Sequence, residues 1–413
     1  MSKGVIFIFG WIGLFVIFNL TGSDAAARAT VATTLGGSAF ILMAVSIVLA
    51  TRPRALESAF GGLDRMYQVH KMAGVSALLL VLIHFFASPE VLPPGTDEIA
   101  NALVPSAPLG MISMVLLILS IVITLNRKIA YHVWRKPHRV MGVLFILIFG
   151  HMVTTPDVFF TRGSAGSLML LLTGLVGIGA YLYTQILASK RAPSHQYTLV
   201  EVNKLERASE LVLAPQGEKL SFKPGQFAFI EIEAEGFNEP HPFTISSAPS
   251  EANLRFTTKV LGDWTRKVRD DLEAGAAVKV TGPYGKFDPA ESTASKQQVW
   301  VAGGIGITPF LSALRQLQSD DNRHITLLYA VREKAEALFL EELQAIANAM
   351  PNVTVKLFES NNGEFVTAET LEQLGQVNQT SYFMCGPKAM VSALIKHVKP
   401  SAHSVHHEYF EFR

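Results

Sequence analysis

Four histidines stand out because they lie inside or at the edges of two long apolar segments. His70 and His84 are separated by fourteen positions in one apolar run, and His138 and His151 by thirteen positions in another. A helix rises 1.5 Å per residue, so each spacing corresponds to roughly 20 Å. Histidine inside a bilayer is costly unless it has a partner. The pattern predicts two facing pairs at two depths, His70 with His138 and His84 with His151.

Two imidazoles that face each other supply the two axial ligands of a b-type haem. We therefore predict two such haems, with the four histidines as iron ligands. Core histidines bonded to carbonyl groups are the alternative, which suits one histidine better than two matched pairs. The spacing of thirteen positions is a difficulty, because it leaves the second imidazole about 140° away around a straight helix. This helix must be distorted or tilted, or it must reach the two haems from different flanks.

Six apolar segments would position these histidines, at about residues 4–20, 35–51, 66–87, 108–125, 138–154 and 166–188. Roughly 20 apolar residues cross a bilayer core. Ten basic residues fall at one end of the segments and only Arg28 and Arg162 at the other, and basic residues favour the cytoplasm. We expect a multi-pass protein of the plasma membrane with a cytoplasmic N-terminus. A cleaved signal peptide in the first segment is an alternative that leaves the orientation unchanged.

The two parts of the chain differ in charge. Residues 1–189 hold 12 Lys and Arg and 7 Asp and Glu, whereas the rest of the 413-residue chain holds 23 and 27. The second part therefore has the charge content of soluble domains, and we place it in the cytoplasm. The net charge of +1 argues against nucleic acid as a partner. The only cysteine, Cys385, excludes an intrachain disulfide.

The second part divides again by its pattern. Short β-rich runs from about residue 195 to residue 281, with turns at Pro224-Gly225 and Gly282-Pro283, indicate a small antiparallel barrel. From residue 298, β-rich runs alternate with helical patterns near 308–318, 334–350, 367–373 and 387–398, which is typical of a parallel sheet covered on both faces. We expect an all-α six-helix transmembrane bundle over 1–190, a β-barrel over 191–294 and an α/β domain over 295–413.

An ordered series of motifs runs through the second part. It comprises His241-Pro242-Phe243-Thr244, Lys259 to Thr265, Gly303-Gly304-Ile305-Gly306, Cys385-Gly386-Pro387 and an aromatic tail. The series resembles the ferredoxin–NADP reductase superfamily. Its His-Pro-Phe-Thr version behind six spans with paired histidines resembles the NADPH oxidase and ferric reductase family in its compact bacterial form. The resemblance covers nearly the whole chain and implies FAD in the barrel, NADPH or NADH in the α/β domain, and two b-type haems.

The resemblance also implies which residues hold these groups. The FAD isoalloxazine falls to His241, Pro242, Phe243 and Thr244, with the Thr244 hydroxyl near flavin N5, and the FAD pyrophosphate to Lys259, Gly262, Trp264 and Thr265. Many relatives have an arginine in place of His241. The nicotinamide dinucleotide falls to Gly303, Gly304, Gly306, Thr308, Arg332, Cys385, Gly386 and Pro387. Cys385 would lie beside the nicotinamide and Arg332 would bind a 2′-phosphate. The alternatives are an ordinary turn at residues 259–265, a small buried cysteine for Cys385 and a solvated arginine for Arg332.

The aromatic end of the chain is the last element of the resemblance. Phe412, or alternatively Phe410, would stack on the flavin and act as a gate for nicotinamide. The implied activity is that of a transmembrane NAD(P)H oxidase that forms superoxide from molecular oxygen outside the cytoplasm. A ferric-chelate reductase and a membrane subunit that feeds an extracytoplasmic partner are the alternatives. Apart from the lipid bilayer, the sequence indicates no obligatory partner.

Overall fold

The computed structural model describes residues 2–23, 27–88, 106–126, 129, 131–156, 160–187, 194–291 and 293–409. The chain forms two compact units, Met1–Arg191 and Ala192–Arg413. Each unit has its own hydrophobic clusters. The two are therefore described one after the other.

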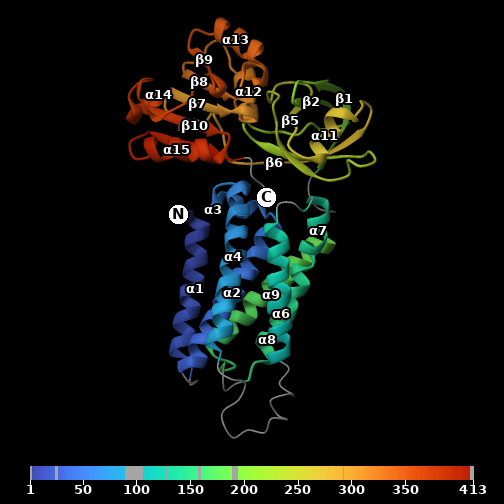
Figure 1. Ribbon diagram of the computed structural model, residues 1–413, viewed down its shortest axis with the longest axis vertical. Helices are drawn as coiled ribbons and strands as arrows, with labels where there is room; N and C mark the ends of the chain where they lie inside the picture. Colours follow the sequence, from blue (N-terminus) through green and yellow to red (C-terminus); the bar gives the residue numbers. More distant parts are fainter. Residues whose placement is uncertain are drawn as a thin grey trace. The chain divides into compact units, whose positions relative to one another are not determined.

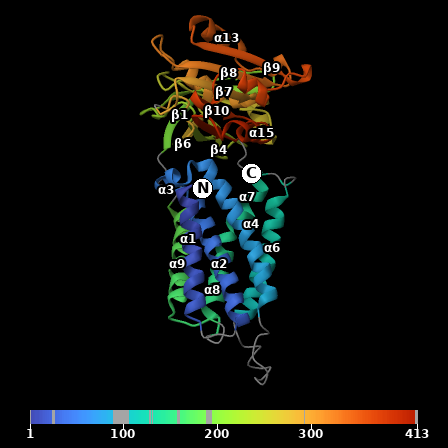
Figure 2. The ribbon, with the colours of Figure 1, turned by 90° about the vertical axis from the view of Figure 1, so that its left-hand side faces the viewer.

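In its described part, the first unit holds six helices that are long and apolar enough to cross a membrane. Figures 1 and 2 show them side by side from two directions. They are α1 (Lys3–Thr21), α2 (Ala27–Ala50), α4 (Leu63–Ala87), α6 (Ser106–Leu125), the span Val133–Thr154 and α9 (Ala165–Ile186). A short helix, α3 (Arg54–Phe60), precedes α4. The predicted six-helix bundle is confirmed.

The fifth span is interrupted. It consists of most of α7 (Tyr131–Arg139) and the whole of α8 (Met141–Thr154). Pro137 lies inside α7, where it lacks a backbone N–H and crowds the carbonyl group one turn before it. The Val140 N–H bonds the Pro137 carbonyl at 3.0 Å, a tightened turn in place of regular helix. Of the alternatives that the histidine spacing left open for this span, the structure shows a distortion, and it lies between His138 and His151.

Polar side chains join α1 to the rest of the bundle. The indole N–H of Trp11 donates to the Thr173 hydroxyl of α9 at 3.1 Å. The buried Asn19 amide donates to the hydroxyl groups of Thr33 and Thr34 on α2 at 3.1 and 2.8 Å. Such bonds hold helices together where lipid provides no hydrophobic driving force.

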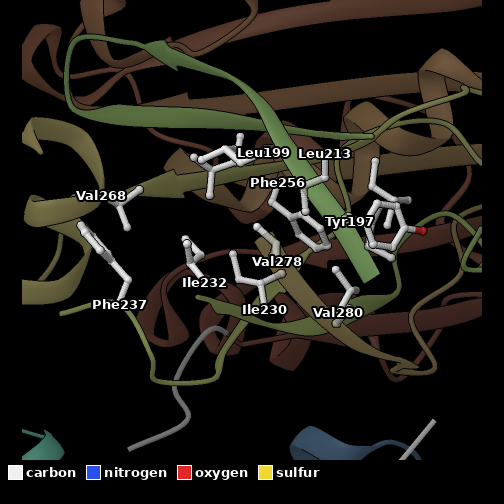
Figure 3. Close-up of a cluster of buried hydrophobic side chains, with 14 of the residues drawn as sticks. Tyr197, Leu199, Leu213, Ile230, Ile232, Phe237, Phe256, Val268, Val278 and Val280 are labelled. Carbon is white, nitrogen blue, oxygen red and sulfur yellow. The ribbon is translucent and has the colours of Figure 1, made fainter. Parts of the chain in front are cut away.

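The second unit begins with a six-stranded antiparallel sheet, in the order β4-β3-β6-β1-β2-β5. Its elements are β1 (Ser194–Lys204), β2 (Ala208–Pro215), β3 (Phe227–Ile232), β4 (His241–Thr244), β5 (Leu254–Lys259), α11 (Asp263–Asp270) and β6 (Ala277–Tyr284). A bridge between Ile245 and Phe256 joins the two edges of the sheet. The barrel core is filled by side chains that point inward from these strands, as Figure 3 shows for Tyr197, Ile230 and Val278. The predicted barrel is confirmed.

A parallel five-stranded sheet follows, in the order β11-β10-β7-β8-β9. The strands are β7 (Gln297–Gly303), β8 (His324–Val331), β9 (Val353–Glu359), β10 (Thr380–Cys385) and β11 (Ser404–Glu408). The helical elements are η1 (Gly304–Ile307), α12 (Thr308–Arg315), η2 (Lys334–Glu336), α13 (Leu340–Ala349), η3 (Ser360–Asn362), α14 (Ala368–Glu372), η4 (Val377–Gln379) and α15 (Lys388–Val398).

Helices cover both faces of this sheet. Trp300 and Ala302 of β7 pack with residues of α12 and α13, whereas Val299 and Val301 pack with residues of α14 and α15. The predicted fold class is confirmed here too. The prediction of one helix over 334–350 was wrong, because Phe339 has φ 58° and the regular helix begins at Leu340.

Candidate functional site

The structure brings the four membrane histidines together in the two pairs that the sequence predicts. The ring centroids of His70 and His138 are 5.9 Å apart, with the ring planes at 72°. Those of His84 and His151 are 6.3 Å apart, with the planes at 69°. We call these the His70 pair and the His84 pair. In each pair, one ring comes from α4 and the other from the α7–α8 span.

Hydrogen bonds at Nδ1 set the direction of three of the four rings. Nδ1 of His84 lies 2.7 Å from the Ala32 carbonyl oxygen, and Nδ1 of His151 lies 2.6 Å from that of Ser106. Nδ1 of His70 lies 2.9 Å from the Ser46 carbonyl oxygen. A carbonyl oxygen only accepts, so each Nδ1 carries the proton and each Nε2 keeps its lone pair for a metal.

Glycines make room for the rings of the His84 pair. A Cβ added at Gly36 would lie 3.0 Å from Cε1 of His84, and one added at Gly110 would lie 2.8 Å from Cε1 of His151. The two rings line a cavity of about 390 Å³ whose walls include Phe40, Met114 and Leu117. A side chain at Gly110 would displace the His151 ring, and one at Gly36 would require the His84 ring to shift by a few tenths of an ångström.

The two pairs fit the axial positions of a haem. A metal–imidazole bond of about 2 Å places the centroids of two axial rings about 6 Å apart, and both measured separations match. Within the described ranges, no three His, Cys, Asp or Glu side chains gather to hold a bare metal ion. Two imidazoles suit an iron whose other four ligands come from a macrocycle.

In the barrel, the predicted flavin residues form one short strand. His241, Pro242, Phe243 and Thr244 are the four residues of β4, which pairs with β3. The Thr244 side chain is 4% exposed, and its hydroxyl has no hydrogen-bond partner in the part of the chain that the structure describes. An unpaired buried hydroxyl costs about 1–3 kcal/mol. Thr244 is therefore suited to bond a group of a ligand.

In the turn after β5, backbone N–H groups form hydrogen bonds within the turn itself. The Thr265 hydroxyl accepts hydrogen bonds from the N–H groups of Leu261 and Gly262 at 3.0 and 3.1 Å. The Trp264 ring is buried against His241, with centroids 4.1 Å apart. Trp264 therefore helps to fix β4, and the N–H of Gly262, one of the residues assigned to the FAD pyrophosphate, already has a partner.

In the α/β domain, the glycine turn and the cysteine motif lie against each other. A Cβ at Gly303 would lie 2.5 Å from Cδ of Pro387, and one at Gly306 would lie 2.2 Å from the Cys385 carbonyl oxygen. Both motifs follow the carboxyl ends of neighbouring strands, β7 and β10, where open α/β sheets bind ligands. Thr308 begins α12, and its hydroxyl donates to the Ile305 carbonyl at 3.1 Å. Cys385 itself is fully buried, which favours the packing alternative.

Arg332 and Lys259 share a carboxylate that the motifs did not single out. Glu336 Oε1 lies 2.8 Å from Nη2 of Arg332, and Oε2 lies 3.2 Å from Nζ of Lys259. Burial alone would raise the pKa of Glu336, but hydrogen bonds from these two cations outweigh it and hold the pKa below its ordinary value. The only sequence signal was the spacing of four positions between Arg332 and Glu336.

Other predicted and missed residues complete the site. Phe412 and Phe410 lie outside the described residues. The sequence did not reveal Ser46, Ala32 and Ser106, which receive the histidine hydrogen bonds, since any helical carbonyl is a formal candidate. A small residue followed four positions later by glycine, as in Ala32–Gly36 and Ser106–Gly110, was the available signal.

Comparison with known families matches three consecutive parts of the chain. Residues 35–149 match a ferric reductase like transmembrane component, residues 208–288 an FAD-binding domain, and residues 300–396 an oxidoreductase NAD-binding domain. The chain is therefore a transmembrane flavoprotein with an NAD(P)-binding domain. This combination of domains fits a ferric reductase-like fusion, which the motifs predict.

Several curated relatives share parts of it. Ferric reduction oxidase 8 of Arabidopsis thaliana is 35% identical over 37% of this chain and 23% of its own length. A superoxide-generating NADPH oxidase heavy chain of Dictyostelium discoideum is 31% identical over 28% of this chain and 19% of its own. Methane monooxygenase component C of Methylosinus trichosporium is 29% identical over 43% and 50%. The chain thus spans half or less of the length of these three relatives.

Among solved structures, a flavohemoglobin from Malassezia yamatoensis with bound FAD and heme is similar with a TM-score of 0.53. It is 19% identical, and the match covers 94% of this chain and 99% of that chain. At this identity, the likeness concerns the fold alone.

Proposed function

We propose that the protein is a transmembrane NAD(P)H oxidase that carries electrons from NAD(P)H, by way of FAD and two b-type haems, to molecular oxygen, which becomes superoxide. The observation that carries this proposal is the pairing of four histidines at two levels of the same two spans, with centroids 5.9 and 6.3 Å apart. Two redox centres at different depths divide a membrane crossing into short electron transfers.

Bound FAD supplies the change from two-electron hydride chemistry to one-electron chemistry. The chain contributes β4, whose backbone forms an edge of the barrel sheet, and the buried Thr244 hydroxyl, which would bond the flavin near N5. Trp264 holds His241 and Phe243 from behind. These residues would orient the flavin ring and exclude water from one side of it.

Bound haem supplies a one-electron iron centre. His70 with His138, and His84 with His151, would hold the two irons through Nε2. The carbonyl groups of Ser46, Ala32 and Ser106 keep the proton of their histidine on Nδ1. They thereby orient the rings before any iron is present and make each imidazole a better electron donor.

We also propose that the N-terminus and the two nucleotide-binding domains lie in the cytoplasm of a cell bounded by this membrane. The basic residues support it, since Arg52 and Arg65 lie beyond the end of α2 and near the start of α4 that bears His70. Arg28 and Arg162 belong to the opposite end, where they donate to the carbonyls of Ala87 and Thr155 at 3.2 Å. The orientation follows the positive-inside rule.

The direct test is an acceptor assay on the purified full chain, loaded with FAD and haem. With NADPH, the protein should reduce cytochrome c, and superoxide dismutase should abolish most of that signal. The matched control is His84→Ala, which should remove this reduction but keep flavin reduction.

Ferric-chelate reductase is the second candidate, and the similarity to ferric reduction oxidase 8 favours it. In that case, an Fe(III) chelate would be reduced rapidly and dismutase would have no effect. Slow reduction of both acceptors would instead indicate an extracytoplasmic partner protein and would contradict the oxidase proposal.

A further inference from the structure

Three cations from two domains converge on one buried carboxylate. In addition to Arg332 and Lys259, Nη1 of Arg207 lies 3.0 Å from Oε1 of Glu336. The Glu336 side chain is only 5% exposed, whereas those of Arg207 and Arg332 are 52% and 61% exposed. The cluster therefore carries an excess of positive charge around an anion that cannot be solvated by water.

The cluster is built from neighbouring strand ends. Arg207 directly precedes β2, and Lys259 ends β5, in register with Ala208. The Val260 N–H donates to the Arg207 carbonyl at 3.0 Å, so these two cations are fixed to one another. Arg332 and Glu336 come from the segment after β8, on the side of the α/β domain.

One of these cations, Lys259, borders the glycine turn. At Gly304, which has φ +54°, an added Cβ would meet only Nζ of Lys259, at 3.7 Å, among the described atoms within 4 Å. The turn follows β7, and Arg332 follows β8, the next strand in the sheet. Open space over a backbone turn that is bordered by a lysine, with an arginine just after the neighbouring strand, is suited to phosphate oxygens.

We propose that Glu336 is an internal counter-anion of the nucleotide-phosphate site. It holds Arg332 in position until phosphate oxygens of the dinucleotide take over the hydrogen bond of this cation. Arg332, the most exposed of the three, is the one that exchanges Glu336 for phosphate, while Arg207 and Lys259 keep the carboxylate paired. This inference rests on the proposed function in one respect, namely that the electron donor is NAD(P)H.

The counter-anion lowers nucleotide affinity, because each phosphate must compete with a carboxylate already in place. Its removal should therefore strengthen binding, whereas the removal of a merely structural residue weakens it. The effect should be larger for NADP⁺ than for NAD⁺, because the 2′-phosphate is the group that Arg332 would meet.

The experiment is calorimetric titration of the purified, FAD-loaded full chain with NADP⁺ and with NAD⁺. Glu336→Gln should bind NADP⁺ roughly five- to tenfold more tightly than the wild type, and NAD⁺ less than threefold more tightly by the same reasoning. Adding Arg332→Gln should reduce the effect on NADP⁺ to that on NAD⁺. The matched control is Glu342→Gln, which breaks the 2.6 Å pair with Arg315 and should leave both affinities unchanged.

Unchanged or weaker NADP⁺ binding by folded Glu336→Gln would overturn the inference. If that variant does not fold, Glu336→Asp is the second variant. Its side chain is shorter by one methylene group, so it should show a smaller gain in NADP⁺ affinity. Failure of both variants to fold would make Glu336 a structural residue and would also overturn the inference. If the wild type binds neither nucleotide, the proposed function fails instead.

Discussion

The His84 pair and the His70 pair differ in how their rings are held. In the His84 pair, both Nδ1 atoms donate to main-chain carbonyls, those of Ala32 and Ser106. In the His70 pair, only His70 has such an acceptor, and Nδ1 of His138 has none among the residues described. His138 instead stacks on Trp134, with centroids 4.6 Å apart and planes at 27°. One pair is oriented by helix backbone alone, and the other depends on an aromatic side chain.

The difference arises from a repeat that is broken at one place. The Ala32 carbonyl accepts the hydrogen bond of His84, and Gly36 leaves room for the His84 ring. Ser106 and Gly110 do the same for His151. The hydroxyls of Ser88 and Thr155 also donate to the carbonyls of His84 and His151, at 2.8 and 2.9 Å. Between α2 and α4 the repeat is regular, because the acceptors Ala32 and Ser46 are separated by fourteen positions, as are His70 and His84.

Between α6 and the α7–α8 span the repeat is irregular. The helix is broken at Val140, and the spacing of His138 and His151 is one position shorter. Ser120 is the counterpart of Ser46 by the same interval, but its carbonyl accepts from the Thr124 hydroxyl at 2.8 Å. That hydroxyl in turn accepts from the Trp134 indole at 3.1 Å. The proline-induced break therefore changes the hydrogen bonding of one histidine, His138. The other three keep main-chain acceptors.

Loss of one ligand of the His84 pair should have the largest effect. His84→Ala leaves one imidazole where two are needed, so we expect the loss of about half of the haem per protein and no electron transfer to the far acceptor. Haem content by pyridine haemochrome measures the first, and flavin reduction by NADPH should persist. His195→Ala, which removes a half-buried histidine of the barrel domain bonded to the Glu218 carbonyl, is the control. Full haem content in His84→Ala would contradict the assignment.

The glycines offer a test confined to the His84 pair. Gly110→Val places atoms closer than 3 Å to the His151 ring, so the imidazole must turn away and the haem of this pair should be lost or weakly bound. A redox titration should then show one component in place of two. Gly74→Val is the control, because an added Cβ there meets nothing within 4 Å among the described atoms. Two unchanged components in Gly110→Val would sink the proposed place of this haem.

Part of this comparison could be predicted from the sequence. The pairing followed from helical rise and the cost of histidine in lipid, and the distortion of the fifth span followed from the shorter spacing of His138 and His151. The acceptors could not be predicted, because the rotation and tilt of α2 and α6 decide which carbonyl comes within reach of a ring. In the same way, Trp264 packs in the barrel core, whereas the resemblance implied that it contacts the FAD pyrophosphate.

Trp134 should matter for the His70 pair only. Since His138 has no acceptor at Nδ1 among the described residues, Trp134→Ala leaves its ring free to rotate. We expect about tenfold weaker haem binding at this pair, with the haem of the His84 pair unaffected, measured by haem titration of the apoprotein. Trp134→Phe keeps a stacking ring and should behave nearly as the wild type. Equal weakening at both pairs would contradict the comparison.

Ser46 should give the smallest and most selective effect. Its hydroxyl lies 2.8 Å from Nδ1 of His70, beside the carbonyl of the same residue, which Ser46→Ala retains. Removing one of two acceptors makes the imidazole a weaker donor and destabilises the ferric form. The reduction potential of this haem should therefore rise by about 20–40 mV, the equivalent of about 0.5–1 kcal/mol. Ser38→Ala, which removes a hydroxyl bonded to the Thr34 carbonyl on the same helix, is the control. A shift of the potential at the His84 pair instead would show that the two sites are not held independently, and the contrast between them would fail.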